Sequence, residues 1–271
     1  MAAASNFLLR QVDNHPARSR CTRAAGRWVR VTLIAVTACL SLATMTSAGI
    51  ETFEGCADSS NPNDMISACT KIVESGWASA RQVTFALNNR ASAHESSGDH
   101  DAAIDDYSRA LGIDPHYGNA LYNRGTAYLN MGELDLAIAD FGAVLEINPR
   151  RADAYHNRGV ALLRQGDNAD AIADLMRAIE IDPALAFAHN NLGVARRRTS
   201  DYAGAIAEFS RAIELKPNYA NALNNRGELY LLKHRYAEAV SDFSDALSIN
   251  PDHAVAARNL LVAHKLLGSD H

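Results

Sequence analysis

The sequence is poor in aromatic residues, and this limits the kind of core that it can form. Aromatic residues make up 7% of its 271 residues, whereas hydrophobic residues as a whole make up 48%. Alanine is abundant instead, and small side chains favour closely packed helices over sheets. The charged fraction of 21% is ordinary for a globular chain, so the composition also argues against intrinsic disorder.

Lysine and acidic residues are scarce in the first 48 residues. This stretch holds six arginines, no lysine and a single acid, Asp13. Subtracting these from the 26 basic and 31 acidic residues of the whole chain leaves 20 basic and 30 acidic residues. The chain after residue 48 is therefore acidic. This argues against nucleic acid as the main partner, because phosphate binding needs a basic face.

The order of features in this leader predicts a secretory signal peptide over residues 1–48. The arginines are followed by an uncharged apolar run at 31–43, and then by the small residues Thr46, Ser47 and Ala48. We therefore expect a periplasmic or secreted protein. Three alternatives remain open: an uncleaved membrane anchor, a lipoprotein with Cys39 as its lipidated residue, and an organelle transit peptide. The membrane is a partner only if the leader is retained or lipidated.

Cysteine is scarce as well. Outside the leader only Cys56 and Cys69 occur, both in the segment 49–83, which also holds a degenerate helix at 63–76. In an oxidising compartment they could form a disulfide, and closing so short a loop would contribute about 3 kcal/mol. The alternative is a pair of small, unbonded core residues. Two sulfurs without a nearby histidine supply too few ligands for zinc.

Proline is infrequent, but five of the seven prolines recur at a constant interval of 34 residues. They are Pro115, Pro149, Pro183, Pro217 and Pro251. Alignment on them gives five units, 84–117, 118–151, 152–185, 186–219 and 220–253, whose residues we number as positions 1 to 34. Position 8 is small (Ala91, Gly125, Gly159, Gly193, Gly227), position 20 is alanine (Ala103, Ala137, Ala171, Ala205, Ala239) and position 24 is large (Tyr107, Phe141, Leu175, Phe209, Phe243).

Each of these columns has a physical reason. Small residues at positions 8 and 20 let two antiparallel helices approach closely, and the large residue at 24 fills the space between them. Glycine at position 15, as in Gly98, Gly132 and Gly166, predicts the turn between the two helices. An Asp or Asn precedes four of the prolines and predicts a helix N-cap with proline at the first helical position. Lys216 is the exception, so we expect a weaker junction there.

This pattern resembles the tetratricopeptide repeat (TPR), which has a 34-residue period, small residues at 8, 20 and 27, an aromatic at 24 and proline at 32. The resemblance covers residues 84–253 and implies an all-α, right-handed solenoid of antiparallel helix pairs, with residues 254–268 as a capping helix. The leader, the two-cysteine segment and the NNRG-type repeats resemble those of exported bacterial TPR proteins. His94, His189 and Arg196 depart from the large residues of the family at positions 4 and 11.

Position 6 is a candidate binding feature, because it is asparagine in every unit. These residues are Asn89, Asn123, Asn157, Asn191 and Asn225, with Asn259 in the capping helix. The resemblance implies that the first helix of each unit lines a concave groove, where an amide can donate to and accept from the backbone of an extended peptide. The alternative, which does not exclude the first, is that each asparagine bonds the neighbouring repeat.

Charged residues supply two further candidates. Arginine at position 7 and an acid at position 23 predict a structural ion pair between the helices of a unit, although Leu192 replaces the arginine opposite Glu208. Several arginines at groove-facing positions could form a basic patch that holds a partner's carboxylate, or they could be solvated helix surface. The groove-facing candidates for peptide binding, besides the asparagines, are Tyr122, Arg164, Arg197 and Arg198.

Sequence motifs of catalysis are missing. The chain has no glycine-rich phosphate loop, nucleophile elbow or HExxH motif, and its histidines form no i, i+4 pair. We therefore expect no catalytic residue, no metal site and no cofactor. The leading hypothesis is a non-catalytic scaffold that binds a protein or extended peptide segment in its groove. The alternative is a structural adaptor or self-associating component of an envelope complex, which would make the chain an oligomer.

Overall fold

The computed structural model describes residues 52–269. The predicted signal peptide, and the alternatives to it, concern residues 1–48 and lie outside this range. Every regular element between 52 and 269 is helical, so the predicted all-α fold is confirmed. Within the same range, no helix combines the length and the apolar character that crossing a membrane requires.

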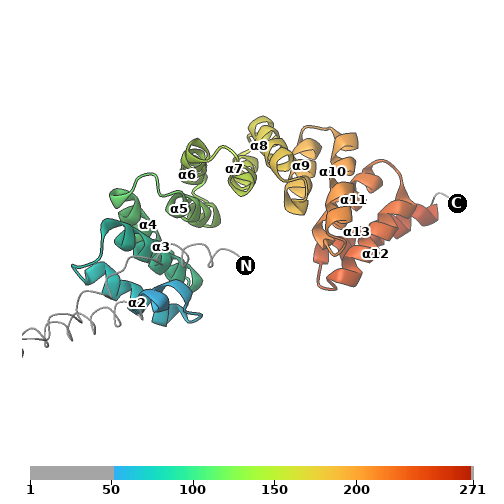
Figure 1. The fold of residues 1–271 in the computed structure, drawn as a ribbon. Coiled ribbons are helices and arrows are strands. Elements are labelled where there is room, and N and C mark those ends of the chain that lie inside the picture. The colour runs from blue at the N-terminus through green and yellow to red at the C-terminus, as the bar shows by residue number, and fades with distance from the viewer. Residues whose placement is uncertain (1–51, 270–271) are drawn as a thin grey trace, which may run out of the picture. The chain divides into compact units, whose positions relative to one another are not determined.

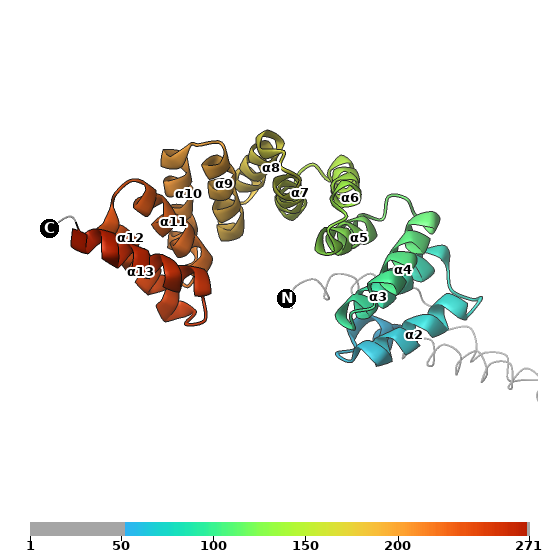
Figure 2. The same ribbon diagram turned by 180° about the vertical axis from the view of Figure 1, so that it is seen from behind.

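The helices form consecutive antiparallel pairs (Figures 1 and 2). The first helix of each pair, called the A helix, is α3 (Ala80–Ser96), α5 (Gly118–Met131), α7 (Ala152–Gln165), α9 (Ala186–Arg198) or α11 (Ala220–Leu232). The second, the B helix, is α4 (His100–Ile113), α6 (Leu134–Ile147), α8 (Asn168–Ile181), α10 (Tyr202–Leu215) or α12 (Tyr236–Ile249). We call these pairs repeats one to five. Helix α2 (Pro62–Glu74) precedes them and α13 (Ala254–Ser269) follows them.

The pairs stack in chain order, and the two kinds of helix have different neighbours. Each A helix packs against its own B helix and against the B helix before it. A helices also contact the next A helix, as α3 does with α5, α5 with α7, and α7 with α9, whereas successive B helices make no comparable contacts. The A helices therefore lie closer together than the B helices, and they form one continuous surface.

The core follows the predicted columns. The alanines at position 20 are completely buried, and the large residues at position 24 are at most 2% exposed. A Cβ atom added to Gly193 would lie 2.6 Å from Cε1 of Phe209, and one added to Gly227 would lie 2.7 Å from Cε1 of Phe243. The prediction that small residues at position 8 make room for the large residue at 24 is thus confirmed.

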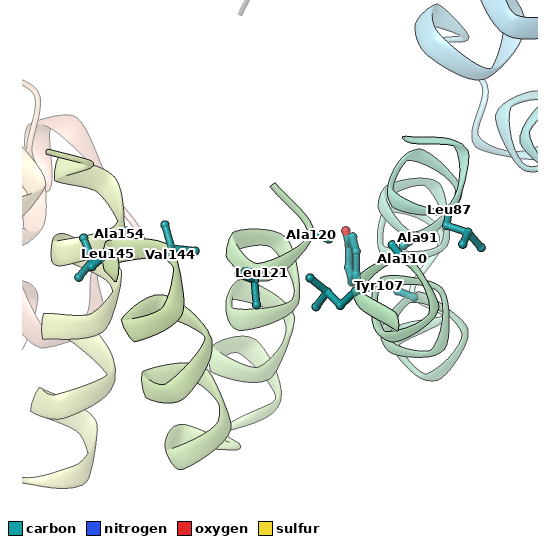
Figure 3. Packing of buried hydrophobic residues seen from close by; sticks show 11 residues of the cluster. Leu87, Ala91, Tyr107, Ala110, Ala120, Leu121, Val144, Leu145 and Ala154 are labelled. Atoms are coloured by element: carbon teal, nitrogen blue, oxygen red, sulfur yellow. The ribbon is translucent and has the colours of Figure 1, made fainter. Parts of the chain in front are cut away.

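The core is also continuous from one repeat to the next. Figure 3 shows Tyr107 of α4 beside Ala120 of α5, in a cluster that also contains Leu121. Farther along the same cluster, Leu145 of α6 lies beside Ala154 of α7. Each repeat therefore buries part of its apolar surface against its neighbour, as expected where a single helix pair cannot bury that surface alone.

The turn between A and B helices requires a left-handed residue at position 15. Gly98, Gly132 and Gly166 have φ values of 80°, 85° and 102°, as the sequence predicts. Ser200 and His234 occupy the same position in repeats four and five with φ values of 65° and 58°. Non-glycine residues adopt this conformation at a cost, so these two turns are strained relative to the other three.

The prediction that the prolines begin the A helices is wrong. Helix α5 begins at Gly118, three residues after Pro115, and Asp114 instead ends the preceding helix α4. The Oδ1 atom of Asp114 accepts a hydrogen bond from the backbone N–H of His116 at 3.1 Å, which is an Asx turn. Asn148, Asp182 and Asn250 make the same bond at 3.1, 3.0 and 3.2 Å. Proline suits this turn because its φ is fixed and it needs no hydrogen-bond partner.

The C-terminal helix differs slightly from prediction. We expected Gly268 to end it, but α13 continues to Ser269 and includes that glycine. Helix α13 packs on α12 and α11 as an A helix would, and Ala256 and Ala263 are buried in this contact. Its other face has no further helix against it within residues 52–269, and Leu261 is 73% exposed there.

The N-terminal end contains an incomplete helix pair, formed by a helical segment at 52–58 and by α2. A disulfide joins Cys56 of the segment to Cys69 of α2. Thr70 accepts a hydrogen bond from Arg90 Nη1 at 2.9 Å, just as Ser108 of α4 accepts one from Arg124 Nη1 at 3.0 Å. Cys69 therefore stands in the place of the large residue at position 24, and the disulfide replaces the packing contact that joins the helices of later pairs.

Candidate peptide-binding surface

The asparagines at position 6 form a regular row across the A helices, which we call the asparagine row. In each of them, Nδ2 donates a hydrogen bond to the preceding helix pair. Asn123 and Asn225 donate at 3.1 Å to Oδ1 of Asn88 and of Asn190. The remaining acceptors are Cys56 O for Asn89 (3.1 Å), Tyr122 Oη for Asn157 (3.0 Å), His156 Nε2 for Asn191 (3.0 Å) and Asn224 Oδ1 for Asn259 (3.4 Å).

The acceptors of these bonds reveal a column that the sequence argument missed. In every repeat the acceptor is the residue at position 5, which is Asn88, Tyr122, His156, Asn190 or Asn224. These side chains share little except an atom that can accept a hydrogen bond. A search of each column for that shared property, in place of shared residue type, would have found it. The bonds link adjacent repeats, which the sequence argument had weighed as the alternative role of the row.

The carbonyl oxygens of the row are of two kinds. The Oδ1 atoms of Asn89, Asn157 and Asn191 each accept a bond from the preceding side chain at position 5, at 3.2, 3.1 and 3.3 Å. The Oδ1 atoms of Asn123 and Asn225, and that of Asn259 in the capping helix, have no partner among residues 52–269 and are not buried. Two members of the row within the five repeats, and Asn259 after them, thus keep a free acceptor while their amide groups are held in place.

His156 is the titratable member of this network. Its Nε2 atom accepts the bond from Asn191 and its Nδ1 atom bonds Asn157 Oδ1, so the neutral ring carries its proton on Nδ1. Burial lowers the pKa of His156 and outweighs the bond to Asn157 and the charge of Asp153, which raise the pKa. Protonation of Nε2 would replace the acceptor by a donor and break the link to Asn191.

Tyr122 is held between neighbouring repeats. Its hydroxyl accepts the bond from Asn157, and the guanidinium of Arg151 lies 4.0 Å from the centre of its ring. Burial raises the pKa of Tyr122, so the hydroxyl stays protonated at neutral pH. One face of this residue is therefore already covered by a side chain of its own repeat.

The three arginines of the expected basic patch each have a partner within the chain. Arg164 Nη1 donates to the carbonyl of Leu129 at the end of α5, at 2.8 Å. Arg198 Nη1 donates in the same way to Leu163 of α7, and Arg197 pairs with Glu228. Arg164 and Arg198 thus bind the carbonyl-rich end of the preceding A helix, where a positive charge is favourable. Arg197 is thus paired with an acid, whereas Arg164 and Arg198 each bond a neutral carbonyl and keep their positive charge.

Comparison with known families assigns the fold. Models of the tetratricopeptide repeat match residues 85–117, 122–186 and 220–253, and a TPR repeat model matches 195–234. Together they cover more than half of the chain. The chain belongs to the tetratricopeptide repeat family. Its TPR fold is that of a scaffold for protein–protein interaction. A comparison with curated proteins gives no match.

Solved TPR structures resemble this chain. A crystal structure of MamA is 28% identical, with a TM-score of 0.56, and the match covers 60% of this chain and 96% of MamA. The structure of YrrB, described as a TPR protein with an unusual peptide-binding site, is 25% identical, with a TM-score of 0.58 and coverages of 70% and 96%. PilW, a type IV pilus biogenesis factor, shares the fold at 22% identity, with a TM-score of 0.59 and coverages of 69% and 92%.

The predicted ion pair between positions 7 and 23 is confirmed in four TPR repeats. Each arginine donates hydrogen bonds from Nε and Nη2 to both oxygens of its partner's carboxylate, a bidentate geometry that makes strong hydrogen bonds. The neighbouring carboxylate raises the pKa of each arginine. The pairs are Arg90 with Asp106 (2.6 and 2.7 Å), Arg124 with Asp140 (both 2.8 Å), Arg158 with Asp174 (2.7 and 2.8 Å) and Arg226 with Asp242 (2.9 and 2.7 Å).

Repeat four holds its acid differently. Leu192 occupies position 7 there, and Glu208 is approached from two other positions. His189 Nδ1 lies 2.7 Å from Glu208 Oε2, and Arg196 Nη2 lies 3.5 Å from Oε1. His189 and Arg196 are the residues that depart from the family at positions 4 and 11. Their contacts explain how the acid is retained where the arginine is lost.

Proposed function

We propose that this TPR protein is a non-catalytic scaffold that binds an extended segment of a partner protein along its A helices. The observation that carries the proposal is the pair of free acceptors that the asparagine row has within the five repeats, Asn123 Oδ1 and Asn225 Oδ1. Each amide is fixed by its bond to the preceding repeat, so the direction of the oxygen is preset. Such preorganisation reduces the ordering cost of binding.

An extended peptide suits these acceptors. Its backbone presents N–H groups at regular intervals, and an asparagine oxygen accepts one without regard to the partner's side chain. The two acceptors lie three repeats apart, in α5 and α11, so one segment that reached both would run across four consecutive A helices. The peptide-binding site named for YrrB supports this mode of binding.

The test begins with peptides that are selected from a display library for binding to the wild-type protein. The affinities of two double variants for these peptides are then compared. Asn123→Ala/Asn225→Ala removes both free acceptors, and Asn157→Ala/Asn191→Ala removes two row members whose oxygens are already bonded. Both variants lose two inter-repeat bonds, and the second also loses the bonds that Asn157 Oδ1 and Asn191 Oδ1 accept, so the stability of the second should fall at least as far. We expect the first to bind about thirtyfold more weakly, because two hydrogen bonds of about 1 kcal/mol each are lost. Equal affinities of the two variants would contradict the proposal.

We also propose that residues 1–48 are a cleaved export signal, followed by the two-cysteine segment 49–83, five repeats over 84–253 and the cap. The order of basic, apolar and small residues supports export. The bonded sulfurs of Cys56 and Cys69 support an oxidising compartment, where disulfides persist. N-terminal sequencing of the protein from its native cell should begin near residue 49. Retention of Met1 would refute cleavage.

Self-association is a second candidate, and the surface of α13 favours it. Leu261 stands at position 8 of this helix, where a complete repeat has a small residue to receive a B helix. Val255 and Val262 are also exposed on α13, so an apolar face is available to a second copy of the chain. Sedimentation should show a dimer that Leu261→Glu converts to a monomer. A wild type that is monomeric at every concentration would exclude this role.

A further inference from the structure

Repeat four contains a pocket that its ion-pair chemistry explains. The pocket has a volume of ≈ 250 Å³ and lies against α8, α9 and α10. Its walls include Leu192 of α9, Glu208 of α10, and Met176 and Ile179 of α8. None of the residues that line it belongs to the asparagine row, so the pocket is independent of the proposed peptide surface.

The regular repeats show what occupies the equivalent place. In repeat five, Arg226 extends from position 7 to Asp242 at position 23, and its Nη1 donates to Ser210 at position 25 of the preceding B helix at 3.0 Å. Repeat two has the same arrangement of Arg124, Asp140 and Ser108. The equivalents in repeat four are Leu192, Glu208 and Met176, and all three line the pocket. The pocket is therefore the space that a guanidinium fills in the regular repeats.

The charge left in this space is incompletely matched. The acids of the regular repeats each receive two guanidinium bonds from one arginine, whereas Glu208 has the ring of His189 and a longer contact of 3.5 Å to Arg196. Arg196 is shared with Asp201, whose Oδ2 lies 3.6 Å from its Nη1. Glu180 also lines the pocket, but it is paired with Arg177 at 2.5 Å, so Glu208 is the carboxylate whose charge is incompletely matched. The pocket therefore retains the capacity to attract a positive group.

The walls suit the rest of such a side chain. Met176, Ile179 and Leu192 offer an apolar surface on which a methylene stem can lie. The side chain of Glu208 is 17% exposed, so an incoming group would meet a partly desolvated carboxylate. A planar guanidinium can bond both oxygens of that carboxylate, as it does elsewhere in this chain, whereas an ammonium cannot match the geometry.

We propose that this pocket receives an arginine side chain of a partner protein, with its guanidinium on Glu208 and its stem against Met176, Ile179 and Leu192. The inserted arginine takes the place of the position-7 arginine that repeat four lacks. The partner therefore supplies the arginine of the ion pair between positions 7 and 23 in repeat four, which is the one repeat of the five that lacks it.

The test uses N-acetyl-arginine methylamide as the probe and the matching citrulline compound as its neutral isostere. Each is titrated into the full chain with ¹³C-labelled methionine and isoleucine methyl groups. We expect saturable shifts of the Met176 and Ile179 methyl signals at millimolar arginine probe, and none with citrulline. No saturable shift with the arginine probe, or equal shifts with both compounds, would overturn the proposal.

Two variants locate the binding. Leu192→Arg supplies an internal guanidinium, and Glu208→Gln removes the charge; each should weaken probe binding at least about tenfold, as expected for loss of a charge-assisted bond. Leu192→Met is the control, because it keeps the pocket apolar and uncharged, and it should bind as the wild type does. Leu192→Arg restores the residue type of the other repeats, so it should fold normally. Undiminished binding by that variant would also overturn the proposal.

Discussion

Repeats two and four hold an acid at the same position by different means. In repeat two a single arginine grips Asp140 with two bonds, whereas in repeat four His189 and Arg196 approach Glu208 from either side of Leu192. Positions 4, 7 and 11 lie on one face of an A helix. The three departures in repeat four are therefore one linked change, because a largely buried carboxylate must keep a donor when its usual one is lost.

The largest effect should come from breaking the regular pair. Arg124→Met leaves Asp140, which is 6% exposed, without its partner and should lower the free energy of unfolding by about 3 kcal/mol. His189→Leu installs a large residue at position 4 and leaves Arg196 beside Glu208, so it should cost less than about 1 kcal/mol. Urea-induced unfolding measures both. Equal losses would show that the two repeats do not differ as we describe.

Packing between the two helices of a pair should be the same in both kinds of repeat. Gly193→Ala in repeat four and Gly227→Ala in repeat five each push a Cβ atom into a phenylalanine ring, and each should cost about 1–2 kcal/mol. Gly142→Ala meets no atom closer than 3.7 Å and should instead stabilise by up to about 1 kcal/mol. Thermal unfolding checks all three. If Gly193→Ala caused no loss of stability while Gly227→Ala did, repeat four would be more loosely packed than repeat five.

The polar network of repeat three should respond to pH. Burial lowers the pKa of His156 in the folded chain below the ordinary value of 6.5, so the unfolded chain binds the proton more readily. The stability that neutral His156 provides is therefore present above about pH 6.5 and is lost as the pH falls further.

His156→Asn gives repeat three the position-5 residue of repeat four, which accepts the same bond without titrating. Wild type should lose about 1 kcal/mol more than this variant between pH 7.5 and 5.5, the contribution of one hydrogen bond. Unfolding at the two pH values measures the difference. Parallel losses in the two proteins would exclude His156 as the titrating group.

The smallest effect concerns the turn of repeat four. Ser200→Gly gives this turn the residue of repeats one to three and relieves the left-handed strain at φ 65°. Relief of about 1 kcal/mol is partly offset by the greater freedom of glycine in the unfolded chain, so a gain of about 0.5 kcal/mol is expected. Gly132→Ala, with φ at 85°, should lose stability. A loss on Ser200→Gly would show that the serine turn is unstrained.

The sequence predicts those features of the fold that depend on side-chain size. Gly227 and Phe243 could be paired from spacing alone, because a ring at position 24 needs a small partner at position 8. The role of the prolines could not be derived in the same way. Asp114 before Pro115 has the composition of an N-cap and of an Asx turn alike, and only the backbone conformation distinguishes the two.

The candidate site was only partly predictable. The asparagine row is visible as a column, but the free oxygens of Asn123 and Asn225 depend on whether the preceding residue donates to them. Tyr122 donates no such bond, and Asn224 donates to Glu228 instead. The contacts around Glu208 could not be predicted for a related reason. They depend on positions 4, 7 and 11 together, and each of these positions taken singly only departs from the family pattern.

The disulfide at the N-terminal end gives the array a direction of unfolding. Linear repeat arrays fray from their ends, because a terminal unit has one neighbour and an internal unit has two. A covalent bond between Cys56 and Cys69 joins the two helices of the first unit, whereas α13 at the opposite end is a single helix held by packing and by the hydrogen bonds of Asn259. Opening should therefore start at α13 and progress toward α2, and reduction of the disulfide should allow it to start from both ends.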